Sequence, residues 1–318
     1  MSRRFDVCNG DADGLCAAVQ WRLQDPRPAE LVTGLKRDIA LLGRVPARAG
    51  DEVNVFDISM RRNRDDLLRL LGDGVRVRYF DHHVADDVPM HANLEAHLDE
   101  ADDVCTSLLV DRCLGGARRA WALVGIYGDN LGAVANKLAF DCGYEPGDCA
   151  GLRRLGELIN YNAYGDHECD VCIAPGLLFP LMVRYPDPRD MMAHEPVVEE
   201  IDAMRRDDLR QAVGVPVFWQ GAAGSVRVLP DASWSRRVLG CLANELANRE
   251  PGLAHAVLKA QGDGYVASVR APLSLPSGAH ALCSRFGGAG RSRAAGIDRL
   301  SREDLPRFVE AFAKASWG

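Results

Sequence analysis

Val77-Arg78-Tyr79-Phe80-Asp81-His82-His83 is the stretch of this sequence that decides the fold. A short apolar, β-prone run ends abruptly in one acid and two histidines. This order is typical of a buried strand that presents polar ligands at its carboxyl end, where open α/β sheets carry their binding sites. Three such residues also recur by chance, so their meaning depends on partners elsewhere in the chain.

Two further β-prone runs also end in acidic residues. Phe5–Cys8 is followed at once by Asn9-Gly10-Asp11-Ala12-Asp13-Gly14, and Val53–Ile58 carries Asp57 near its end. Because the carboxyl ends of parallel strands meet at one sheet edge, we expect these acids to converge. Paired carboxylates would repel a bare phosphate, so the glycine-rich turn favours a divalent cation. An Asx-turn with a helix N-cap is the alternative interpretation of this turn.

A fourth acid, Asp129, follows the apolar segment Trp121–Tyr127, which we expect to be helical. Alone, Asp129 is a turn residue. If the three earlier positions bind metal, it becomes the further carboxylate that a dinuclear site needs.

The second half of the chain has its own signal, Gly287-Gly288-Ala289-Gly290-Arg291-Ser292-Arg293-Ala294-Ala295-Gly296. Clustered glycines let backbone amides approach a ligand, and small residues would let a helix begin there. Residues 265–300, which include this stretch, contain five arginines and one acid. The arginines are Arg270, Arg285, Arg291, Arg293 and Arg299. They predict recognition of phosphate or carboxylate. A surface loop with solvated arginines is the alternative.

Composition excludes several classes of protein. The 318 residues are 47% hydrophobic and 26% charged, which is ordinary for a globular protein, and the net charge of −7 disfavours a long duplex-DNA surface. No apolar leader follows Met1, and Ile173–Val183 is too short and proline-broken to cross a membrane. We therefore expect a cytoplasmic protein with reduced cysteines. The lone pair Cys169 and Cys172 lacks the four regular ligands of structural zinc.

The length predicts two domains. We expect an α/β fold: an N-terminal parallel-sheet domain over residues 1–186 with helices on both faces, and a smaller C-terminal α/β domain with a mixed sheet over 214–318. The polar, proline-containing residues 187–213 are predicted to be a linking helix.

Taken together, these motifs resemble the DHH phosphoesterase superfamily over nearly the whole chain. Asp11-Ala12-Asp13-Gly14 resembles its first motif, Asp57 its second, Asp81-His82-His83 its third and Asp129 its fourth. Gly287–Gly296 resembles the glycine-rich signature of the DHH-associated C-terminal domain, and Ser268-Val269-Arg270 the strand before it. The two-domain length is closer to oligoribonucleases and nucleotide phosphodiesterases than to the larger RecJ-type exonucleases.

The resemblance implies two Mn²⁺ ions, with Mg²⁺ or Co²⁺ as substitutes. The implied metal ligands are Asp57 as the bridge, Asp11 for the first ion, and Asp13, His82 and Asp129 for the second. His83 would contact the scissile phosphate and Asp81 would orient the site. The implied substrate-binding residues are Arg270, Gly287, Gly288, Arg291 and Arg293.

Two positions depart from the family pattern. Many relatives have a histidine just before the paired aspartates, whereas this chain has Val7, Cys8 and Asn9. The C-terminal signature usually has a histidine where this chain has Arg291, and arginine is a poorer proton donor. The first departure bears on how tightly the first metal ion binds. The second bears on whether the nucleotide specificity of the family applies to this chain.

The expected function is metal-dependent hydrolysis of a small phosphoester, most of all a short single-stranded oligonucleotide or a phosphorylated nucleotide. An exopolyphosphatase or pyrophosphatase is the enzymatic alternative, and a non-catalytic nucleotide-binding protein is the alternative of another class. We expect no membrane and no long duplex DNA as partners, and a monomer or homodimer.

Overall fold

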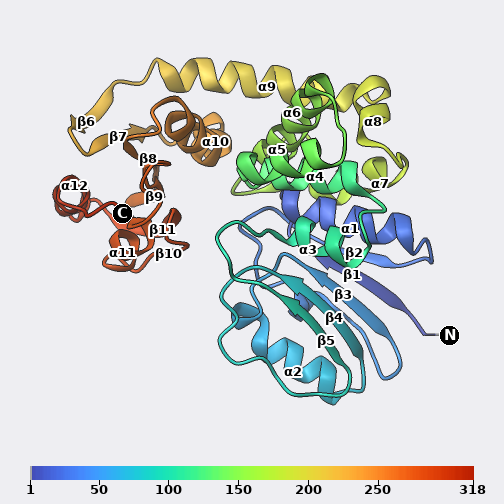
Figure 1. The fold of residues 1–318 in the computed structure, drawn as a ribbon. Coiled ribbons are helices and arrows are strands. Elements are labelled where there is room, and N and C mark those ends of the chain that lie inside the picture. Colours follow the sequence, from blue (N-terminus) through green and yellow to red (C-terminus); the bar gives the residue numbers. More distant parts are fainter. Residues whose placement is uncertain (1) are drawn as a thin grey trace. The chain divides into compact units, whose positions relative to one another are not determined.

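The computed structural model describes residues 2–318, which divide into two compact units. The first ends at Ile201 and the second runs from Asp202 to Gly318 (Figure 1). The division falls within the predicted linking segment 187–213, and the domain limits given above remain a prediction. None of the helices in residues 2–318 combines the length and the apolar character that crossing a bilayer requires.

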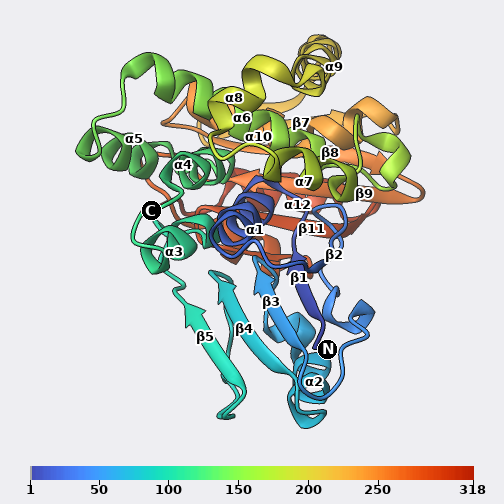
Figure 2. The same ribbon diagram turned by 90° about the vertical axis from the view of Figure 1, so that its right-hand side faces the viewer.

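The first unit is built on a parallel sheet in the order β2-β1-β3-β4-β5. Its strands are β1 (Arg4–Cys8), β2 (Glu30–Val32), β3 (Glu52–Phe56), β4 (Arg76–Asp81) and β5 (Leu94–Leu98). Figure 2 shows β3, β4 and β5 running in the same direction. β1, β3 and β4 are almost fully buried, because both faces of their sheet are covered. This confirms the predicted parallel sheet.

Helices cover both faces of this sheet, as predicted. On one face α2 (Arg64–Gly72) packs leucines against Val55, Val77 and Tyr79. On the other, α1 (Ala12–Gln24) packs against α3 (Thr106–Cys113) and α4 (Arg119–Gly128) (Figure 1). The remaining helices of this unit are α5 (Gly132–Asp141), α6 (Pro146–Asn162), α7 (Pro175–Val183) and α8 (Pro188–His194), with short 3₁₀ turns at Leu42–Arg44, Arg61–Asn63 and Glu168–Asp170.

The single linking helix predicted over 187–213 is wrong. The chain forms α8 and then α9 (Pro196–Val213), separated by Glu195. Glu195 is extended, with φ −97° and ψ 112°. A residue before proline is sterically excluded from the helical region, so Pro196 ends one helix and begins the next.

The second unit has a six-stranded mixed sheet in the order β10-β11-β9-β8-β7-β6, which confirms the predicted mixed sheet. Only the β7–β8 pairing is parallel within residues 202–318. The strands are β6 (Val217–Gly221), β7 (Gly224–Leu229), β8 (Ala254–Gln261), β9 (Gly264–Arg270), β10 (Ala289–Gly290) and β11 (Ala294–Ser301), and the helices are α10 (Ser233–Arg249), α11 (Ala279–Ser284) and α12 (Leu305–Ala313). Phe308 and Phe312 of α12 lie in its core.

The glycine-rich stretch does not begin a helix, contrary to the sequence prediction. It forms the antiparallel pair β10–β11, closed by a tight turn at Ser292-Arg293. Gly290 has φ 145°, which side chains rarely adopt, and a Cβ at Gly288 would lie 2.8 Å from Ile297 Cγ1 and collide with the Gly296 carbonyl. The glycines therefore permit close strand pairing.

Candidate metal centre

The polar residues of the first unit gather where three neighbouring strands end. Asn9 follows β1, Asp57 follows β3, and Asp81 is the last residue of β4. Hydrogen bonds continue the sheet beyond the strands: the Asn9 amide donates to the Phe56 carbonyl (3.2 Å), and the Asp57 amide to the Phe80 carbonyl (3.0 Å). The segments that carry the site are thereby fixed to one another.

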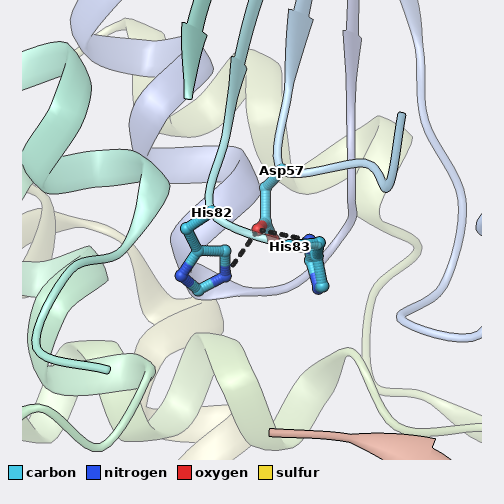
Figure 3. A group of neighbouring side chains, drawn as sticks. All are labelled: Asp57, His82 and His83. Carbon is cyan, nitrogen blue, oxygen red and sulfur yellow. Dashed lines mark ion pairs between the residues drawn. The ribbon is translucent and has the colours of Figure 1, made fainter. Parts of the chain in front are cut away.

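Asp57 is the centre of the cluster. Its backbone is left-handed, with φ 58°, a conformation that aspartate tolerates better than most residues. The side chain is buried, and its Oδ1 accepts a hydrogen bond from Thr106 Oγ1 (3.2 Å). His82 Nε2 lies 3.2 Å from the same oxygen, and His83 Nδ1 lies 3.9 Å away (Figure 3).

His82 is held in one orientation by the backbone. Its Nδ1 lies 2.8 Å from the Val104 carbonyl, which can only accept, so Nδ1 carries the proton. Nε2 is then directed at Asp57 and lies 3.8 Å from Asp13. A backbone carbonyl that fixes the far nitrogen is the usual support of a metal-binding histidine. Ligand atoms of Asp57, His82 and His83 all lie within 4.8 Å of one another.

His83 faces outward and is supported from behind. Its side chain is 43% exposed, whereas Asp81 is fully buried. His83 Nδ1 donates to Asp81 Oδ1 (2.7 Å), and the other oxygen of Asp81 has no hydrogen-bond partner among residues 2–318. Nε2 of His83 is therefore the nitrogen left to meet a ligand.

Asp13 has a structural task that the sequence did not reveal. Its two carboxylate oxygens accept the backbone amides of Thr106 (2.8 Å) and Ser107 (2.7 Å), at the start of α3. Ser107 Oγ also donates to the Asp13 carbonyl (2.8 Å). Asp13 thus fixes the N-terminus of α3 against α1 while facing His82.

Asp11 is engaged on both oxygens. One accepts the Gly14 amide (3.1 Å), so the N-cap interpretation of this turn is confirmed. The other accepts from the ammonium of Lys36, which follows β2. Asn9 Oδ1 accepts the Asp11 amide (3.1 Å), and Asn9 Nδ2 donates to the Lys36 carbonyl (3.2 Å).

Asp129 ends α4, where its amide donates to the Gly125 carbonyl (2.9 Å). It is half-buried. Its negative charge raises the pKa values of Asp13, His82 and Lys36, so it belongs to the same electrostatic environment.

The acids of this cluster are crowded enough to perturb one another. Burial, and then the charge of Asp57, raise the pKa of Asp13 to about 7. Burial opposes the charged form of His82, but Asp57, Asp129 and Asp13 outweigh it and raise its pKa to about 10. Burial would also raise the pKa of Asp57, yet the hydrogen bond and charge of His82 hold it well below its usual range. Such a site favours a bound cation.

No family model and no curated protein matches this sequence. Solved structures do. A DHH domain described as a member of a family of ribosomal proteins is 15% identical, with 98% of this chain and 86% of that chain covered and a TM-score of 0.68. Exonuclease RecJ bound to manganese is 18% identical (98% and 89% covered, TM-score 0.53). PggH, a pGpG-specific phosphodiesterase from Vibrio cholerae, is 15% identical (98% of both chains covered, TM-score 0.53).

The chain shares the fold of these three structures, the first of which is described as a DHH domain. In this fold Asp81 ends β4, and His82 and His83 follow it. The acids of the first two motifs follow β1 and β3, and β3 lies between β1 and β4 in the sheet. The donors fit a divalent ion: a buried carboxylate and an oriented imidazole nitrogen lie at one sheet edge, with the His83 imidazole beside them. On the Asp11 side the fit is poorer, because an ammonium group already occupies that carboxylate.

The predicted substrate residues lie in the second unit of the DHH fold. Arg270 ends β9, and its guanidinium donates to Asn244 Oδ1 (2.6 Å) and Ser268 Oγ (3.0 Å). Arg291 and Arg293 lie at the β10–β11 turn, where the Arg293 carbonyl accepts the Ala271 amide (2.9 Å). Gly287 and Gly288 precede β10. The structure thus brings the β9 end and the glycine-rich turn together within this unit.

Lys36 and Thr106 are residues of the candidate metal centre that the sequence did not predict. Lys36 follows a three-residue strand, β2, that has no clear alternation to mark it. Recognising that β2 pairs with β1 in parallel would have placed Lys36 at the same sheet edge as the acids. Thr106 lies at the start of α3, and its sequence position carries no sign of the contact with Asp57.

Proposed function

We propose that this protein is a divalent-metal-dependent phosphohydrolase that acts on a small phosphoester. The observation that carries the proposal is the convergence of Asp57, His82 and His83, with ligand atoms within 4.8 Å, after adjacent parallel strands. The fold supports it, because RecJ is an exonuclease and PggH a phosphodiesterase. A non-catalytic nucleotide-binding protein would have no need for this ligand set.

Asp57 and the Nε2 of His82 are the ligands we assign to the metal, with Asp13 and Asp129 beside them. A bound divalent ion lowers the pKa of a coordinated water and neutralises charge on a phosphoryl group. His82 keeps its orientation through Val104. Both carboxylate oxygens of Asp13 accept backbone amides of α3, so this side chain cannot move freely to bind the metal. Its contribution is mainly its negative charge.

His83 is the residue we assign to the scissile phosphate. Burial opposes the charged form of His83, but the Asp81 carboxylate outweighs it and raises the pKa of His83. This favours the form in which the outward nitrogen can donate. A positioned donor of this kind stabilises the charge that develops on a phosphoryl oxygen. Asp81 acts through His83 and touches no substrate.

Mn²⁺ is the metal we propose, with Mg²⁺ or Co²⁺ as substitutes. A mixed set of carboxylate oxygens and imidazole nitrogens suits Mn²⁺. The description of RecJ as bound to manganese supports this choice for the fold.

The substrate we favour is a short oligonucleotide or a phosphorylated nucleotide. PggH is described as specific for the dinucleotide pGpG, and the chain aligns with it over 98% of both lengths. We assign a substrate phosphate to Arg270, Arg291 and Arg293, with Gly287 and Gly288 allowing close approach. Because Arg291 recognises phosphate rather than a base, exopolyphosphatase or pyrophosphatase activity is the second candidate.

A product-release assay in Mn²⁺ tests the proposal. The substrates are a linear dinucleotide, a cyclic dinucleotide, a 3′,5′-bisphosphate nucleotide, pyrophosphate and polyphosphate. Turnover of a nucleotide that is lost in Asp57→Asn supports the first choice. Asparagine is used because it tolerates the left-handed backbone at this position. Turnover of polyphosphate alone supports the second candidate, and no Mn²⁺-dependent turnover of any substrate contradicts both.

A further inference from the structure

Lys36 is held at the candidate metal centre by its backbone as well as by its side chain. Its amide donates to the Ala163 carbonyl (3.1 Å), and its carbonyl accepts from Asn9 Nδ2 (3.2 Å). The residue is therefore fixed between the segment after β1 and the end of α6.

The Lys36 ammonium is also surrounded by acceptors. It donates to Asp11 Oδ2 and lies 3.4 Å from Asn160 Oδ1. Its nitrogen lies 5.5 Å from the centroid of the Tyr164 ring, at a distance typical of a cation–π contact. Asn160 is buried, and the Lys36 side chain as a whole is 32% exposed.

This arrangement engages both oxygens of the Asp11 carboxylate. One oxygen accepts the Gly14 amide and the other the Lys36 ammonium. A divalent ion on Asp11 would have to displace the ammonium or lie against it, and like charges at such a separation repel strongly in a buried site. Upstream of Asp11, Val7 and Cys8 offer no imidazole, and Asn9 already uses both ends of its amide.

We propose that Lys36 takes the place of one metal ion, so that this centre holds a single divalent ion, on the Asp57–His82 side. The inference rests on the proposed function and changes the number of ions from the two that the resemblance implies. The Lys36 ammonium neutralises Asp11 and supplies a fixed positive charge to the substrate phosphate. It needs neither dehydration nor exchange, unlike a second ion.

The number of bound ions tests this inference without reference to turnover. The full chain, stripped with chelator and dialysed against Mn²⁺, is measured for metal content, and the bound Mn²⁺ is examined by electron paramagnetic resonance. We expect one Mn²⁺ per chain with the spectrum of an isolated ion. Two ions per chain, or an exchange-coupled spectrum, would overturn the inference and leave the proposed function intact. No bound ion would overturn both.

Variants of Lys36 separate its charge from its packing. Lys36→Met should bind a second, weaker Mn²⁺ at Asp11, and at Mn²⁺ levels that fill only the first site kcat should fall about 10²-fold. Lys36→Arg retains the charge and should bind one ion. Lys137→Met is the matched control, because Lys137 is exposed and, within residues 2–318, its ion pair is with Asp141 on the surface. A folded Lys36→Met that still binds one ion with wild-type kcat contradicts the inference.

Discussion

The pair formed by Asp81 and His83 allows a test of how the site is organised. Asp81 is fully buried, and its bond to His83 Nδ1 is short, at 2.7 Å. In Asp81→Asn the amide oxygen can still accept this bond, but the acceptor no longer carries a negative charge. A bond to a charged group contributes about 1.5–3 kcal/mol and a neutral one about 0.5–1.5 kcal/mol, so the loss is about 1–1.5 kcal/mol. If that difference falls on the transition state, kcat decreases about 5–15-fold.

His83→Gln removes the imidazole donor and leaves a neutral, differently placed amide. Loss of one positioned donor costs about 10²–10³-fold in rate, so this variant should be the slower of the two. Because Asp81 acts through His83, adding Asp81→Asn to His83→Gln should change kcat less than twofold. The two changes are therefore expected to be strongly non-additive.

The assay is the initial rate of hydrolysis at saturating Mn²⁺, with metal content measured for each variant. Asp81→Asn should also lower the pKa of His83, so the decline of activity with rising pH should move to lower pH. If Asp81→Asn slows the His83→Gln enzyme by the same factor as it slows wild type, Asp81 does not act through His83. If Asp81→Asn loses the metal, Asp81 belongs to the metal shell.

Four further predictions concern both units. Mn²⁺ at 100 times its Kd should raise the free energy of unfolding by about 2.7 kcal/mol, and chelator should reverse the effect. A denaturation midpoint that does not change with Mn²⁺ would contradict the proposed metal site. Arg291→Ala should raise KM far more than it lowers kcat, and the reverse would place Arg291 in the chemistry. Gly288→Ala should destabilise the second unit by about 1–3 kcal/mol in chemical denaturation, because its Cβ meets the backbone of β11. Gly252→Ala, which has open space, is the control and should stay within about 0.5 kcal/mol. Burial lowers the pKa of His255, so the unfolded chain takes up the proton first as pH falls; stability should decline below about pH 6.5, and His255→Gln should flatten that slope.

Strand ends were the most predictable part of this molecule. The runs before Asn9, Asp57 and Asp81 are β-prone, and each ends at a polar residue, so both the parallel sheet and its acidic edge follow from the pattern. β5 was missed because Leu94–Leu98 is a half-exposed edge strand with glutamate and histidine in it. Its formation depends on pairing with β4 and not on its own composition.

Contacts between distant segments were beyond the sequence. The role of Asp13 in holding α3, and that of Lys36 against Asp11, depend on which helix and strand lie next to β1. The glycine-rich turn was misinterpreted for a related reason. Glycine allows both a helix start and close strand pairing, and only the partner strand, β11, decides between them. The same glycine-rich sequence is therefore compatible with both conformations.

The hydrogen bonds that tie Asn9 to Phe56 and Asp57 to Phe80 have a consequence for folding. They join residues from β1, β3 and β4, whose strands occupy residues 4–8, 52–56 and 76–81, so the ligands meet only after long loops have closed. Contacts between residues that are far apart in sequence form slowly during folding. A metal that binds only the completed sheet edge should therefore leave the refolding rate unchanged and slow unfolding. It would stabilise the folded protein kinetically without helping the sheet to nucleate.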